Sequence, residues 1–138
     1  MSPAAELDLL LELVMVEARA IIARFGEFLP FAAVIPAEAD EPELVSPWDG
    51  PLVVPTREAE DFLSADLRER VAHGTVRAAA LVTQRRMRAA VTVRLEHARL
   101  SQALVVSTPF TRRRLGGRPI TYGDPTSEAA PPLFFVAL

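Results

Sequence analysis

The sequence predicts an α+β domain with a long N-terminal helix, a first strand, a second helix and then an antiparallel β-meander, the helices packed on one sheet face. Apolar residues recur at helical spacing over residues 3–25 and 57–73, whereas short apolar and alternating runs dominate after residue 76. The chain has 138 residues, of which 50% are hydrophobic and 24% charged. We therefore expect one domain, 1–138, of ordinary globular composition.

The two predicted helices have recognisable ends. Ser2 and Pro3 suit the N-cap and the first turn of the first helix, and Gly26 suits the position after its last turn. The second helix is expected to begin after Thr56 as its N-cap and to end before Gly74. Its acidic residues cluster near the start and its basic residues near the end, which complements the helix dipole.

The predicted strands are short apolar runs between glycines and prolines. The first strand is expected to contain Phe28, Phe31, Val34 and Ile35 and to end at Pro36, and Pro30 within it favours an edge position or a bulge. An acidic loop over 37–50 follows it, and 52–54 is expected to add one short strand. The later strands are expected at 76–83, 89–96, 103–108, 120–122 and 133–136.

One later strand alternates clearly enough to assign its two faces. Along 89–96, Val91, Val93 and Leu95 share one face, and Thr92, Arg94 and Glu96 share the other. We expect the apolar face of this strand to be buried against the helices.

The composition excludes several kinds of chemistry. With no cysteine, the chain has no disulfide, zinc-cysteine site, iron–sulfur cluster or thiol nucleophile. All 15 basic residues are arginine, so a Schiff-base lysine and the lysine of a phosphate-binding loop are absent as well. No GxSxG or SxxK motif occurs. We therefore predict no catalytic residue, no cofactor and no metal, and favour a protein that is not an enzyme.

The net charge of −3 argues against a general nucleic-acid binder. The apolar run near the N-terminus is too short to span a bilayer and is interrupted by acidic residues. It also lacks the positive segment of a signal peptide, so we expect a cytoplasmic location and no membrane partner.

Two histidines, His73 and His97, are the first titratable candidates. Glu96 and His97 are neighbours on a predicted strand, where adjacent side chains point to opposite faces, so one site would not receive both. His73 is expected to cap the last carbonyls of the second helix. The acidic run 38–43 lacks the ligand spacing and the glycine of a calcium-binding loop and is interpreted as a solvated loop.

The sharpest charge feature is a basic loop around Gly116-Gly117, which contains Arg112, Arg113, Arg114 and Arg118. Guanidinium groups bind phosphate or carboxylate through paired hydrogen bonds, so this loop is the candidate anion-binding site. The alternative function is accordingly a small ligand-binding domain or enzyme that uses 112–118 to hold an anion. No nucleic-acid-binding signature accompanies the loop, so nucleic acid is not the expected partner.

The first helix carries apolar residues on two sides. The stripe expected to face the core comprises Leu7, Leu11, Val14, Ala18, Ile22 and Phe25. Nearly opposite lie Leu9, Leu13, Val16 and Ala20. Either a loop or Phe134-Phe135 covers this second face, or it is a subunit interface.

We favour the interface, because contiguous apolar strips on protein surfaces usually mark contact sites. Two-fold dimers are the commonest closed assemblies, so we expect a homodimer with Leu13 near the axis. Glu6 or Glu17 of one copy would then face Arg19 or Arg24 of the other.

A resemblance rests on a few turn and apolar residues. Gly26-Glu27-Phe28-Leu29-Pro30-Phe31 follows the long helix, and Glu96-His97 precedes a hairpin that ends in Pro109-Phe110. In these features the chain resembles a group of small uncharacterised bacterial α+β proteins known from GC-rich genomes. The resemblance implies the fold and assigns no functional residue. The sequence as a whole predicts a non-enzymatic module, of regulatory or immunity type, that binds itself or another protein.

Overall fold

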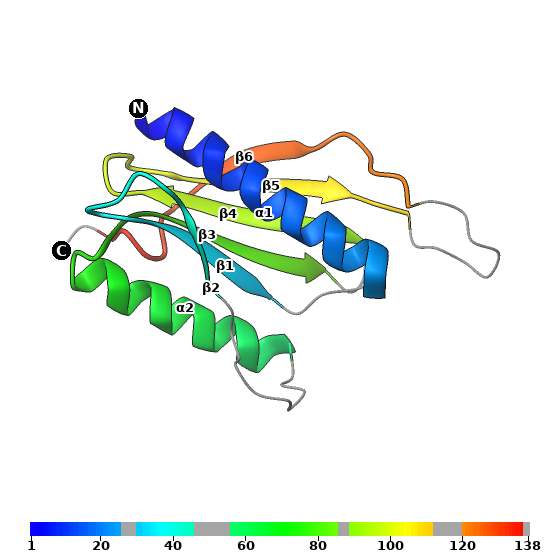
Figure 1. Cartoon of the computed structure of the whole chain (residues 1–138), viewed down its shortest axis with the longest axis horizontal. Helices are drawn as coiled ribbons and strands as arrows, with labels where there is room; N and C mark the ends of the chain where they lie inside the picture. The colour runs from blue at the N-terminus through cyan, green and yellow to red at the C-terminus, as the bar shows by residue number, and fades with distance from the viewer. Residues whose placement is uncertain (26–29, 46–55, 86–88, 112–119, 137–138) are drawn as a thin grey trace.

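The computed structural model describes residues 1–25, 30–45, 56–85, 89–111 and 120–136 (Figure 1). Its elements are α1 (Pro3–Phe25), β1 (Phe31–Pro36), β2 (Glu43–Val45), α2 (Thr56–Ala72), β3 (Val76–Arg85), β4 (Ala90–His97), β5 (Ala103–Pro109) and β6 (Thr126–Ala130). This is the predicted α+β fold with the expected order of helices and main strands. Within the described residues, no helix is long and apolar enough to cross a membrane.

The strands form one six-stranded antiparallel sheet in the order β2-β1-β3-β4-β5-β6. β3 to β6 are a meander, as expected. β1 pairs with β2 on one side and β3 on the other, so it is an interior strand and not the edge strand that Pro30 suggested. Pro30 precedes the strand, and its missing N–H therefore interrupts no ladder.

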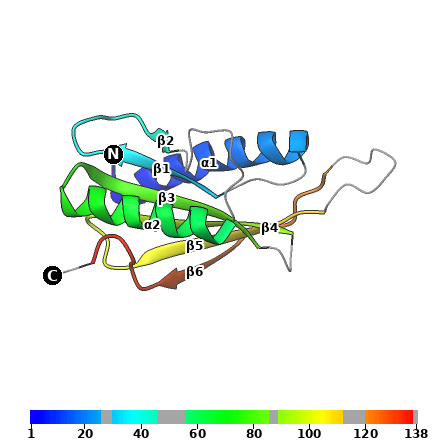
Figure 2. The ribbon, with the colours of Figure 1, turned by 90° about the horizontal axis from the view of Figure 1, so that it is seen from below.

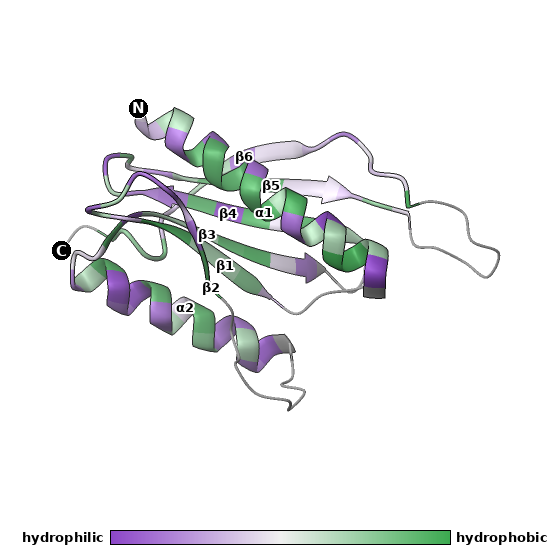
Figure 3. Ribbon diagram, viewed as in Figure 1, coloured by the Kyte–Doolittle hydropathy of each residue, from purple (hydrophilic) through white to green (hydrophobic). Residues whose placement is uncertain are grey.

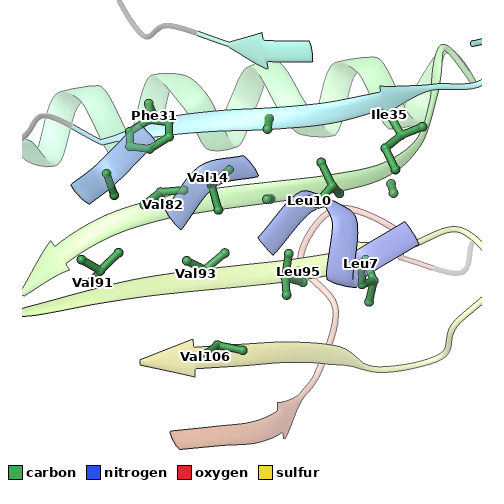
Figure 4. Packing of buried hydrophobic residues seen from close by; sticks show 14 of the residues in the cluster. Leu7, Leu10, Val14, Phe31, Ile35, Val82, Val91, Val93, Leu95 and Val106 are labelled. Atoms are coloured by element: carbon green, nitrogen blue, oxygen red, sulfur yellow. The ribbon is translucent and has the colours of Figure 1, made fainter. Parts of the chain in front are cut away.

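The two helices lie on opposite faces of the sheet, which corrects the expectation that both pack on one face. α1 shares a core cluster with Ala33 and Ala80, whereas α2 shares another with their chain neighbours Ala32 and Ala79. Figure 4 shows α1 in front of the strands and α2 behind them. Because β1 and β3 are apolar at consecutive positions, both of their faces have to be covered.

The buried side of α1 is rotated slightly from the predicted stripe. It consists of Leu7, Leu10, Val14, Ala18 and Ile22, while Leu11 is only partly buried. The rotation also turns Glu6 toward the sheet, where only 6% of this residue is exposed. The side chain of Phe25 lies outside the described part of the structure.

The hairpin of β4 and β5 has the predicted orientation. Val91, Val93 and Leu95 are at most 1% exposed and lie in the cluster beneath α1 (Figure 4). Val93 pairs with Val106, and Leu95 pairs with Leu104, so the same face continues onto β5.

The end of α2 follows the sequence signal closely. Gly74 has a φ of 69° and is the residue after the last turn. Its N–H donates to the carbonyl of Val71, and the N–H of Thr75 donates to that of Arg70, so the last turn of the helix is capped.

The C-terminal region differs from the prediction. Residues 120–122 contribute a single bridge, Phe110 to Tyr122, and 133–136 form no strand. β6 borders the sheet instead, and its sequence, Thr-Ser-Glu-Ala-Ala, is mostly exposed on both faces. Without an apolar periodicity it carried no strand signal. The short strand expected at 52–54 lies outside the described residues.

Candidate functional site

Three polar side chains from distant parts of the chain meet beneath the N-terminal half of α1. Glu6 belongs to α1, Arg77 to β3 and His97 to the end of β4. Oε1 of Glu6 lies 3.0 Å from Nε2 of His97, and Oε2 accepts a 2.6 Å hydrogen bond from Nε of Arg77. Glu6 is 6% and His97 2% exposed. These three residues form a buried ionic cluster, called the Glu6 cluster below.

The hydrogen bonds of His97 define its tautomer. Nδ1 accepts the backbone N–H of Arg99 at 3.0 Å, so in the neutral ring this nitrogen carries no proton. The ring proton is therefore on Nε2, which donates to Glu6. Both ring nitrogens are engaged inside the protein.

The protonation of Glu6 follows from opposing effects. Burial raises the pKa of Glu6, but the hydrogen bonds from His97 and Arg77, together with the positive charge of Arg77, outweigh it. The net result is a pKa of Glu6 below the ordinary glutamate value. The side chain is therefore a carboxylate at neutral pH and a strong acceptor for both partners.

Arg77 extends the Glu6 cluster to the turn after β1. Its NH1 donates to the carbonyl of Pro36 at 2.7 Å and also to those of Ala37 and Ala39. One guanidinium thus joins α1, β3 and the turn between β1 and β2.

A glutamate–histidine pair can serve as a catalytic base, but a base needs a nitrogen within reach of a substrate. Here both nitrogens are occupied and buried, so the arrangement holds the fold together.

Glu96 points to the opposite face from His97, as predicted for adjacent strand residues. It is 1% exposed and accepts hydrogen bonds from the backbone N–H groups of Leu133, Phe134 and Phe135. Glu6, which is hydrogen-bonded to His97, and Glu96, its neighbour in the sequence, therefore both accept hydrogen bonds inside the molecule.

The outer face of α1 carries the residues predicted to form an interface. Val16 is 65% exposed and Ala20 is exposed, whereas Leu9 is half-buried and Leu13 packs partly against the core beneath α1. In Figure 3, α1 is green along much of its length, while α2 shows more purple between its green segments. The apolar strip therefore exists, and Val16 is its most exposed large side chain.

The other sequence candidates have different outcomes. Arg112, Arg113, Arg114 and Arg118 lie outside the described residues. The chain on either side of them is held together by Thr111, whose N–H donates to the carbonyl of Thr121 at 2.8 Å. Tyr122, next to this pair, lies 4.5 Å beneath the guanidinium of Arg19. Tyr122 therefore lies beside α1.

Two other expectations concerned a helix end and an acidic loop. Nδ1 of His73 lies 2.9 Å from the carbonyl of Glu69, as expected for a residue that caps α2. The acidic residues Glu38, Asp40 and Glu41 are exposed. Glu43 is exposed too, but it begins β2, so this part of 37–50 is a strand and not the expected loop. In the described part of the chain, no three His, Asp or Glu side chains are grouped to hold a metal ion.

Sequence reasoning missed the Glu6 cluster because its members lie far apart in the chain. Glu6 is 71 residues from Arg77 and 91 from His97, and no local motif joins such positions. The only available signal was an acidic residue next to the apolar stripe of a helix. No protein-family model, curated protein or solved structure matches this chain, so its site residues rest on its own geometry.

Proposed function

We propose that this protein is a non-enzymatic protein-binding module that pairs with a second copy of itself through the outer face of α1. The observation that carries the proposal is the exposed apolar strip around Val16, flanked by charges of both signs. The regulatory or immunity-type role, the cytoplasmic location and the bacterial source expected from the sequence belong to the same proposal.

The strip has the character of a helix–helix contact. Val16 and Ala20 are one turn apart and exposed, and Leu9 and Leu13 continue the row toward the N-terminus with part of their surface still accessible. Small and branched side chains of this kind let two helices approach closely. Leu13 already packs partly against the core, so we propose a symmetry axis at Val16 and not at Leu13.

The charges along the strip favour an antiparallel arrangement. Glu12 and Arg19 are exposed and seven residues apart, which is about two helical turns, so they lie on the same side of α1. Along the helix axis, Val16 lies between them. A two-fold axis at Val16 brings Glu12 of each copy near Arg19 of the other. Two such pairs contribute more to orientation than to affinity.

The charge pairs that we propose differ from those expected from the sequence. Glu6, one of the residues expected to face an arginine of the partner, is committed to His97 and Arg77 inside its own chain. Glu12 replaces it in the proposed pairing.

Sedimentation equilibrium of three proteins tests the proposal. One helix face is a small interface, so we expect a Kd of roughly 10–100 µM and a dimeric parent well above that concentration. Val16→Glu should be a folded monomer. Phe62→Glu is the matched control, since Phe62 is 56% exposed but lies on α2, and it should dimerise like the parent. A parent that stays monomeric, or a Val16→Glu protein that still dimerises, contradicts the proposal.

A charge exchange tests the orientation separately. Glu12→Arg and Arg19→Glu should each weaken the dimer several-fold, because each places like charges opposite one another. The double variant should recover part of the loss. If the two single changes simply add, Glu12 and Arg19 do not meet across the axis.

A further inference from the structure

The second candidate surface lies on the other side of the molecule, where the C-terminal residues 131–135 cross the face of the sheet that α2 covers. Figures 1 and 2 both show this red segment beside the second half of α2. It follows β6 directly and makes no strand pairing of its own. We call residues 131–135 the strap.

The strap is held chiefly by the carboxylate of Glu96. Oε1 accepts the backbone N–H of Phe134 at 2.9 Å, of Leu133 at 3.1 Å and of Phe135 at 3.2 Å. Oε2 accepts the N–H of Leu133 at 2.9 Å. Three successive N–H groups that converge on one point form a concave anion site of the kind that binds phosphate or carboxylate. Here a buried side chain of the same protein supplies the anion.

The remaining contacts fix the ends and the centre of the strap. Arg94 NH1 donates to the carbonyl of Pro131 at 2.9 Å, and Arg68 Nε donates to the carbonyl of Leu133 at 3.3 Å. Phe134 is 4% exposed and belongs to the cluster that includes Leu63 and Leu67 of α2. The strap is thus seated by its backbone and by the buried side chain of Phe134, and Phe135 packs partly against the same cluster.

The position that the strap occupies has the features of a peptide-binding site. One wall is apolar and comes from α2, the other is polar and comes from β4, and Arg68 and Arg94 contact backbone carbonyls. All of these polar contacts are made to the main chain of the strap. Phe134 is the one side chain of the strap that is fully buried, and it is called the anchor below. Leu133 is 41% and Val136 59% exposed, so the residues around the anchor leave much of their surface uncovered.

We propose that this is a peptide-binding groove which the strap of the same chain occupies as an internal ligand. Its preferred occupant is a short segment with a phenylalanine in the middle of a bend and three free N–H groups in succession, as in Pro131–Val136. A competing segment of this chemistry displaces the strap. This inference is independent of the α1 surface, which lies on the opposite face of the sheet.

The first test measures amide hydrogen exchange of the full chain. Glu96→Gln keeps the size of the side chain but replaces one carboxylate oxygen with an NH₂ group that faces the donor Arg94. The amides of residues 133–135 should exchange at least tenfold faster, with those of β3 and β4 unchanged. Glu128→Gln, on the exposed strand β6, is the control and should change nothing. Unchanged exchange at 133–135, or equal acceleration throughout the sheet, overturns the role of Glu96.

The second test supplies the occupant in trans. A fluorescent peptide with the sequence of residues 131–136 is titrated into the parent and into Phe134→Ala, whose own strap has lost its anchor. Phe134→Ala should bind the peptide at least tenfold more tightly than the parent, and adding Glu96→Gln should abolish that gain. Equal binding to the parent and Phe134→Ala contradicts the groove. If Phe134→Ala fails to fold, the less severe Phe134→Leu takes its place, with the same expectation and the same contradicting result.

Discussion

Removal of the Glu6 carboxylate is the most informative perturbation of the fold, because one side chain ties α1 to two strands. Glu6→Ala leaves Nε2–H of His97 without an acceptor in a site where that side chain is 1% exposed. A buried donor left unpaired costs about 1–3 kcal/mol, and a hydrogen bond to a charged group contributes about 1.5–3 kcal/mol. Arg77 loses less, because it keeps its carbonyl partners and its side chain is 27% exposed.

The cost of the unpaired donor and the loss of its hydrogen bond are partly the same energy. We therefore expect the free energy of unfolding to fall by about 3 kcal/mol in Glu6→Ala. For a domain of this size each kcal/mol corresponds to roughly 3 °C, so the Tm should fall by about 9 °C. Glu69→Ala is the control, since Glu69 is an exposed residue of α2 and should change the Tm by about 1 °C at most. The measurement is thermal unfolding followed by circular dichroism at neutral pH. A Glu6→Ala Tm within about 2 °C of the control would refute the reasoning.

The lowered pKa of Glu6 predicts that the stability of the protein falls at acidic pH. The pKa of Glu6 is lower in the folded chain than the ordinary value of 4.5. Its stabilising contribution is therefore complete above pH 4.5 and is lost as the pH falls through the lowered folded pKa. The difference in unfolding free energy between the parent and Glu6→Ala should shrink as the pH is lowered below 4.5. A difference that widens there would contradict the assignment.

Three further changes test the local structure. Val93→Asp places a charge at a position that is 0% exposed beneath α1, so urea unfolding should show a loss of at least about 3 kcal/mol. Gly74→Ala meets no atom within 4 Å but keeps a φ of 69°, so backbone strain alone should cost about 1–2 kcal/mol, and a Tm equal to the parent's would argue against that conformation. Ser2→Ala removes the hydroxyl that accepts the N–H of Ala5 at 3.1 Å, which should lower the stability by about 1 kcal/mol and speed amide exchange in the first turn of α1 only.

The sequence by itself determined the features that depend on neighbouring residues. Gly74 ends α2 because a residue without Cβ adopts a positive φ at little cost, and this requirement is local. The buried face of β4 followed from the alternation of Val91, Val93 and Leu95, since adjacent strand residues point in opposite directions. The opposed directions of Glu96 and His97 followed from the same rule.

The tertiary structure alone decided what each face and each charge meets. The continuous apolar runs of β1 and β3 showed that these strands are buried but not which helix covers which side, because either face can receive either helix. Glu6 looked like an ordinary surface residue of a helix until the fold placed it against Arg77 and His97. Glu96 likewise acquired its partners only when residues 133–135 returned to the sheet, because a buried carboxylate must find donors wherever the chain supplies them.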